Sequence, residues 1–111
     1  ANVLGLLGLE RKAGRVYTGQ EQVEKQARAQ ALAVVFHASD GAEEGLRKIT
    51  AAMRAGGQLE SVAIRREFSC DELSLALGLP NVIHAAVPAG QSGAALARAA
   101  ERLARYRASP E

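Results

Sequence analysis

The chain has 111 residues, of which 48% are hydrophobic and 23% are charged, and its formal net charge is +2 at pH 7. This length fits one domain, and the many apolar residues, spread along the whole chain, exclude disorder as its main description. No stretch reaches the roughly 18 uncharged apolar residues that a membrane span needs, so we expect no membrane partner. The single cysteine, Cys70, excludes an internal disulfide framework and predicts a cytoplasmic protein.

Basic residues are concentrated toward the two ends of the chain. Residues 1–37 carry five basic and three acidic side chains, residues 38–78 carry five and seven, and residues 79–111 carry four and two. A fold that brings both ends to one side would create a modest basic face. Eleven basic residues are arginine, which suits phosphate and base edges. A solvated surface with a bias toward arginine explains the same composition equally well, and we expect the helical face of Arg98, Arg102 and Arg105 to be solvated.

The first half of the chain predicts two helices and two strands. Thr18-Gly-Gln-Glu21 has the pattern of a capping box, in which a hydroxyl and a carboxylate close the start of a helix. The continuous apolar run Leu32–Phe36 is typical of a central strand covered on both faces. The expected ranges are a helix between Asn2 and Gly14, a strand at 16–18, a helix at 19–29 and a strand at 32–36.

Three helices and two strands are expected in the second half. Ser39 and Asp40 are alternative N-caps for the third helix, and Ser69-x-x-Glu72 is another capping-box pattern. Gly78 stands where the fourth helix would end. The expected ranges are a helix at 41–55, a strand at 62–64, a helix from Ser69 to Leu77, a strand at 82–87 and a last helix that ends near Tyr106, with that side chain facing inward.

The order of these elements predicts the fold class. Helices and strands alternate as αβαβαβαβα, which implies helices on both faces of one sheet. The predicted fold is therefore a three-layer α/β/α sandwich with four strands. We expect residues 1–107 to form a single domain and residues 108–111 to form a frayed tail.

The sequence contains no pattern that indicates an enzyme. It has neither a P-loop nor a G-x-S-x-G nucleophile elbow, and His37 and His84 have no cysteine or histidine at zinc-ligand spacing. Cys70 lacks a paired base, and the carboxylate pairs Glu43-Glu44 and Asp71-Glu72 lie in the first turns of predicted helices, where acids complement the helix dipole. We therefore expect no catalytic residue, no metal and no cofactor.

Three segments carry a resemblance to a known family: Leu-Leu-Gly-Leu-Glu-Arg-Lys-Ala-Gly at 6–14, Tyr-Thr-Gly-Gln-Glu-Gln-Val-Glu-Lys at 17–25, and Leu-Ser-Leu-Ala-Leu-Gly-Leu-Pro-Asn-Val-Ile-His-Ala-Ala-Val at 73–87. In this order and spacing, they resemble the kink-turn RNA-binding ribosomal-protein superfamily of the L-seven-Ae type, and most closely its bacterial YlxQ-like branch. The resemblance covers nearly the whole chain. Asn81–Ala86 together with Arg102–Arg107 is similar to a module that follows a YlxR-type N-terminal domain in proteobacterial two-domain proteins.

The resemblance implies a four-stranded mixed sheet and two RNA contacts. One lies at the start of the second helix, where the family motif G-x-N-E-x-x-K matches Gly19 and Lys25, with Glu21 and Gln22 in place of the Asn-Glu pair. The other is the loop before the last strand, which corresponds to 79–83. The residues that the resemblance assigns to RNA binding are Gly19, Gln20, Glu21, Gln22, Lys25, Leu79, Pro80, Asn81, Val82 and Ile83.

The chemistry of these residues suits that role. A helix N-terminus offers unpaired N–H groups and a positive dipole end to phosphate, and a glycine there lets the nucleic acid approach closely. Glutamine amides suit base edges, Lys25 suits phosphate, and the apolar loop suits an extruded base. Two alternatives stay open: Glu21 acts only as a helix cap, and Leu79 and Val82 belong only to the core.

We therefore expect non-enzymatic binding of structured, kink-turn-like RNA, with ribosomal RNA among the candidate targets, in ribosome assembly or translation. This requires that the start of the second helix and the 79–83 loop lie side by side. Two alternatives remain: a protein-interaction domain that has lost RNA affinity, which Glu21 and the low net charge favour, and the RNA-recognition domain of a larger modifying enzyme.

Overall fold

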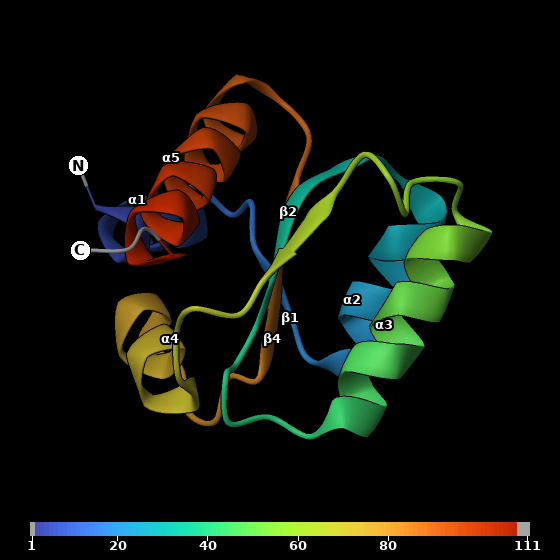
Figure 1. The fold of residues 1–111 in the computed structure, drawn as a ribbon, viewed down its shortest axis with the longest axis horizontal. Coiled ribbons are helices and arrows are strands. Elements are labelled where there is room, and N and C mark those ends of the chain that lie inside the picture. The colour runs from blue at the N-terminus through green and yellow to red at the C-terminus, as the bar shows by residue number, and fades with distance from the viewer. Residues whose placement is uncertain (1, 109–111) are drawn as a thin grey trace.

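A four-stranded sheet stands between two layers of helices in the computed structural model, which describes residues 2–108 (Figure 1). The expected tail at 109–111 lies outside the described residues. The elements in chain order are α1 (Val3–Lys12), β1 (Tyr17–Thr18), α2 (Gln20–Ala29), β2 (Leu32–His37), α3 (Glu43–Ala55), β3 (Ala63–Arg65), α4 (Cys70–Leu77), β4 (His84–Pro88) and α5 (Gln91–Ala108).

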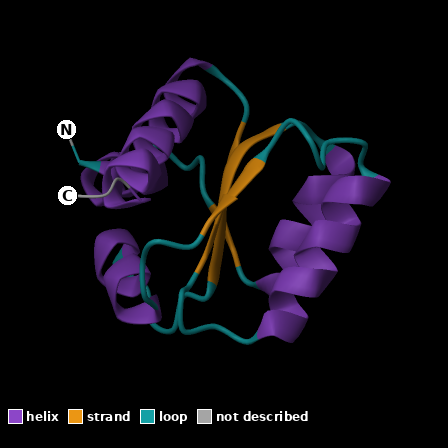
Figure 2. Ribbon diagram, viewed as in Figure 1, coloured by secondary structure: helices purple, strands orange, loops and turns teal. Residues whose placement is uncertain are grey.

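The sheet is mixed, with the strand order β1-β4-β2-β3. Strand β2 pairs parallel with β3, whereas β4 pairs antiparallel with both β1 and β2. Helices α1, α4 and α5 cover one face, and α2 and α3 cover the other (Figures 1 and 2). The predicted three-layer α/β/α sandwich with a four-stranded mixed sheet is confirmed.

Each face of the sheet has its own apolar core, because successive side chains of a strand point to opposite faces. Val34 and Phe36 of β2 face α1, α4 and α5, where Leu7 belongs to the same buried cluster. Val35 faces α2 and α3 in the second cluster, together with Ile49. β2 is therefore the central strand covered on both faces that its apolar run predicted.

Three of the predicted helix ends are confirmed. The side chain of Asn2 accepts a hydrogen bond from the backbone N–H of Gly5 at 2.6 Å and caps α1. Ser69 and Glu72 form the complete capping box of α4. The same helix ends at Gly78, which adopts φ 66° and ψ 30°, a left-handed conformation that glycine tolerates best.

Two other predicted caps are wrong. Thr18 lies in β1, paired with Ala85 of β4, so Gly19 is the N-cap of α2 and no side chain caps that helix. The third helix begins at Glu43 rather than at residue 41, and neither Ser39 nor Asp40 caps it. The side chain of Asp40 instead accepts a hydrogen bond from the backbone N–H of Cys70, at the start of α4.

The remaining differences concern element ends. The third strand spans 63–65 instead of 62–64, and the fourth spans 84–88 instead of 82–87, because strand pairing sets these limits. The last helix continues to Ala108, the first residue of the expected tail, and Tyr106 is 81% exposed rather than turned inward. No helix within residues 2–108 combines the length and the apolar character needed to cross a membrane.

Candidate nucleic-acid interface

The pairing of β1 with β4 brings the two predicted RNA-contact segments together. Thr18 stands opposite Ala85 in this pair, and the backbone N–H of the next residue, Gly19, donates to the carbonyl of His84 at 3.3 Å. The segment 79–83 leads directly into His84, so the start of α2 and this loop share one end of the sheet. The spatial arrangement that the sequence analysis required is therefore present.

Gly19 gives the start of α2 its open geometry. Its φ of 92° and ψ of 150° lie in a region that side-chain-bearing residues rarely adopt, and nothing lies within 4 Å of the position a Cβ would take. Its carbonyl accepts the backbone N–H of Val23, the first bond of the helix. Because Gly19 has no side chain, the N–H groups of the first turn keep no capping group.

Glu21, Gln22 and Lys25 are exposed on the first turns of α2. Glu21 makes no cap, because the capping position belongs to Gly19. It lines the groove between α2 and α3 together with Lys48 and Arg47. The alternative that Glu21 serves only as a cap is thus excluded, and its carboxylate is accessible.

Gln20 is held more tightly than the sequence suggested. Its side-chain Nε2 donates to the carboxylate of Glu24 and to the backbone carbonyl of Gly45, at 3.2 Å from the latter. A Cβ on Gly45 would approach Oε1 of Gln20 to 2.7 Å. The side-chain donors of Gln20 are therefore engaged within the protein, and its side chain can offer an outside ligand only the amide oxygen.

The loop 79–83 is divided between core and surface. Val82 is a buried core residue, and its backbone N–H donates to the Ser74 hydroxyl at 2.9 Å. Leu79 packs partly against the same core. Pro80 and Asn81 are exposed, and Asn81 adopts a φ of 54°, which asparagine tolerates better than most residues. The core interpretation therefore holds for Val82 and, in part, for Leu79.

Ile83 is the apolar side chain of this loop that faces the start of α2. It lines an open depression of about 510 Å³ together with Gln20, His84 and Lys48. Its backbone carbonyl accepts the N–H of Ala38 at 2.8 Å, which ties the loop to the end of β2. The depression is completed by residues 40–45, a segment that the sequence analysis did not assign to the site.

A buried pair of histidines lies beneath this depression. His37 and His84 face each other across β2 and β4, with Nδ1 atoms 3.1 Å apart and ring centroids 4.9 Å apart. Burial, together with the neighbouring His37 ring, lowers the pKa of His84 to about 4, and burial also lowers the pKa of His37. Both rings are neutral at pH 7, so one Nδ1–H donates to the other Nδ1.

No sequence pattern indicated this pair, because its members are 47 positions apart and neither has a partner at ligand spacing. Only the strand register joins them. Gly45 permits the close approach of α3: a Cβ there would stand 2.9 Å from Nε2 of His84. Within the described residues, no group of three or more His, Cys, Asp or Glu side chains is arranged to hold a metal ion.

The carboxylate pairs serve structural contacts. Glu43 pairs with Arg66 at 2.7 Å, Glu44 pairs with Arg47, and Glu72 belongs to the capping box of α4. Cys70 is partly exposed, and its Sγ lies 3.8 Å from the Ser74 hydroxyl.

Comparisons with known proteins support the fold but indicate no function. No protein-family model matches the chain, and no curated protein matches it. Among solved structures, it is similar to one titled as that of a protein with unknown function from Bacillus halodurans C, with a TM-score of 0.78. The sequence identity is 23%, and the match covers 91% of this chain and 98% of the other. At this identity the likeness supports the α/β/α sandwich alone.

Proposed function

We propose that this domain binds structured, kink-turn-like RNA in the cytoplasm and that it acts by binding rather than by catalysis. One observation carries the proposal: the uncapped start of α2 lies beside the loop 79–83, joined by the hydrogen bond from Gly19 to the His84 carbonyl. Ribosomal RNA and a preceding YlxR-type domain are the partners that the family resemblance suggests.

Each part of the surface has a role in this proposal. The free N–H groups of the first turn of α2 bind a phosphate, assisted by the positive end of the helix dipole. Lys25 adds a cation one turn further on, and Gln22 offers both donors and acceptors to a base edge. Ile83 provides an apolar contact for an unstacked base, the form in which RNA bases are usually recognised.

The test compares a kink-turn RNA with a regular duplex of equal length, by filter binding at physiological salt. We expect the wild-type domain to prefer the kink-turn by about tenfold or more. Lys25→Glu should remove about fivefold or more of that affinity, because a phosphate contact becomes a repulsion. Equal binding of both RNAs by the wild type would refute the proposal.

The matched control is Lys12→Glu. Lys12 is also exposed and lies at the end of α1, which covers the opposite face of the sheet (Figure 1). Lys12→Glu changes the net charge by the same amount as Lys25→Glu, so an equal loss of RNA affinity in both variants would indicate nonspecific attraction to RNA. Only a selective loss in Lys25→Glu supports the assigned surface.

Acidic side chains around the depression favour a second candidate function, a protein-interaction domain without RNA affinity. Asp40 and Glu44 line the depression, and Glu21 and Glu24 line the adjoining groove. Such carboxylates repel phosphate and suit a basic protein partner. Affinity capture from lysate with and without nuclease separates the two functions, because partners that all disappear after nuclease treatment are bound through RNA.

A further inference from the structure

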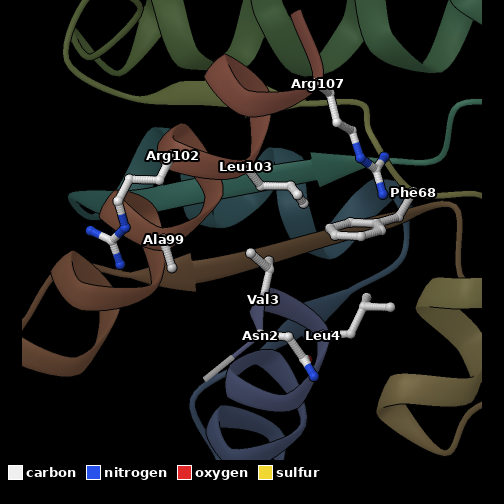
Figure 3. Close-up of a pocket in the computed structure, with 8 residues that line it drawn as sticks. All are labelled: Asn2, Val3, Leu4, Phe68, Ala99, Arg102, Leu103 and Arg107. Carbon is white, nitrogen blue, oxygen red and sulfur yellow. The ribbon is translucent and has the colours of Figure 1, made fainter. Parts of the chain in front are cut away.

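A cavity of about 420 Å³ lies on the face of the sheet opposite α2 and α3 (Figure 3). It is bounded by the start of α1, by the second half of α5 and by Phe68 in the loop between β3 and α4. None of its lining residues belongs to the candidate nucleic-acid interface. Cavities of about 300–1,000 Å³ are the usual size for small-molecule sites.

Apolar side chains form the wall of the cavity. Val3 of α1 and Ala99 of α5 are buried, and Leu103 of α5 is half-buried. The Phe68 ring forms one end and packs against Phe36 with 6.3 Å between the ring centroids. The ring therefore packs against the core at this end of the space. In Figure 3, Val3 and Leu103 lie between α1 and α5 and flank the open region.

Two arginines of α5 give the cavity a positive rim. Arg107 donates from Nη1 to the backbone carbonyl of Glu67 at 2.7 Å, and its guanidinium lies over the Phe68 ring, 5.4 Å from the centroid. Arg102 is exposed and forms no ion pair with any described residue. Among the residues that the structure describes, no carboxylate lines the cavity, and that of nearby Glu67 is paired with Arg65 at 3.3 Å.

The start of α1 adds to this positive potential. Its first turn contains no acidic residue, so the positive end of the helix dipole is not compensated there. Asn2, the cap of this helix, itself lines the cavity. An apolar wall with a cationic rim disfavours cations, and a neutral ligand would leave the Arg102 guanidinium without a charged partner.

We infer that this cavity binds a small organic carboxylate with an apolar body, of the size of a medium-chain fatty acid. The carboxylate pairs with Arg102, whose planar guanidinium matches it with two parallel hydrogen bonds. The apolar body lies against Val3, Leu103 and the edge of the Phe68 ring, while Arg107 keeps that ring in place. This site is independent of RNA binding, and either proposal can fail without the other.

The experiment titrates the folded domain with octanoate, octanol and octylamine and follows backbone amide shifts by NMR. The three probes share one apolar body and differ only in charge. We expect octanoate to bind about fivefold or more tightly than octanol, with shifts concentrated in α1, the second half of α5 and Phe68, and octylamine to bind more weakly than octanol. Equal affinity for octanoate and octanol, or shifts confined to other regions, would overturn the inference.

Variants assign the affinity to particular side chains. Arg102→Gln should reduce octanoate affinity about fivefold and leave octanol unchanged. Arg105→Gln is the matched control, because Arg105 is an exposed arginine of the same helix that does not line the cavity. Leu103→Trp, checked for folding by thermal melting, should fill the space and reduce the affinity for both probes. Identical octanoate binding by Arg102→Gln and Arg105→Gln would refute the assignment.

Discussion

Helices α2 and α4 begin at the same end of the sheet, yet their first turns differ. At α4, the hydroxyl of Ser69 accepts the backbone N–H of Glu72 at 3.1 Å, and the carboxylate of Glu72 accepts the N–H of Ser69 at 2.9 Å. Asp40 accepts the N–H of Cys70 at 2.9 Å. At α2, the capping position is Gly19, and no side chain accepts from the first turn.

This difference gives the first turn of α4 a structural role and leaves the first turn of α2 available to a ligand. The N–H groups of Ser69, Cys70 and Glu72 at the start of α4 are satisfied by Glu72, Asp40 and Ser69, so an external anion would have to displace these side chains. The first turn of α2 keeps its donors for water or a ligand, and its position beside Ile83 adds an apolar surface. The proposed RNA contact belongs to α2 for this physical reason.

Acid should destabilise the domain through the histidines beneath the start of α2, and this is the largest effect we expect. The folded state lowers the pKa of His84 to about 4, so the unfolded chain takes up the proton first as the pH falls. The free energy of unfolding should decrease between about pH 6.5 and pH 4 by on the order of 3 kcal/mol. Urea unfolding followed by circular dichroism at pH 7, 6, 5 and 4 measures this decrease.

His84→Gln is the control for that pH dependence. It removes the titrating ring, so its stability should vary less between pH 6.5 and 5 than that of the wild type. Hydrogen exchange adds a test of the comparison between the helices: acid should release the N–H of Gly19, which the carbonyl of His84 accepts, before the N–H of Cys70, which Asp40 accepts. If the free energy of unfolding changed equally with pH in the wild type and in His84→Gln, the assignment of the pH dependence to His84 would be contradicted.

Gly19→Asp should place a negative charge at the start of α2, strain the backbone at its φ of 92°, and reduce RNA binding. The new carboxylate would lie at the positive end of the helix dipole and repel phosphate. We expect a loss of kink-turn affinity of about tenfold or more, measured by filter binding. Gly57→Asp is the matched control: Gly57 also has a positive φ, of 74°, and open space around its Cβ position, but it follows the far end of α3. Equal losses in both variants would exclude a special role for the start of α2.

The two helix starts also show what the sequence can predict. Ser69-x-x-Glu72 and Thr18-x-x-Glu21 have the same pattern, but only the first forms a capping box. The first needs only contacts within four residues. The second fails because β4, more than sixty residues away in the chain, recruits Thr18 as a strand residue. Helical periodicity and apolar runs predicted every element because those signals are local.

The candidate site shows the same contrast between local sequence signals and contacts that depend on distant parts of the chain. The two contact segments were predicted from a family resemblance, and β1–β4 pairing brings them together. The His37–His84 pair was not predicted, because it depends on the register between β2 and β4. The internal hydrogen bonds of Gln20 were missed as well, since they depend on how closely α3 packs at Gly45.

Ser69→Ala should weaken folding but leave RNA binding unchanged. Loss of an N-cap side chain typically costs about 1 kcal/mol, and here it also removes one half of a capping box. Chemical denaturation measures the loss, and filter binding of the kink-turn RNA provides the second measurement. A fall in RNA affinity without a fall in stability would place the start of α4 in the RNA-binding surface and remove the contrast with α2.

Glu21→Gln should produce the smallest effect, with the stability nearly unchanged and RNA binding slightly tighter. Because Glu21 caps nothing, its replacement should change the free energy of unfolding by no more than about 0.5 kcal/mol, the range of ordinary surface substitutions. Removing a negative charge beside the phosphate site should tighten RNA binding about twofold, with a larger gain at low salt. Glu72→Gln, in the first turn of α4, removes the same charge and should leave RNA affinity unchanged. An equal gain in both variants would mean that net charge, rather than the position of Glu21, controls the interaction.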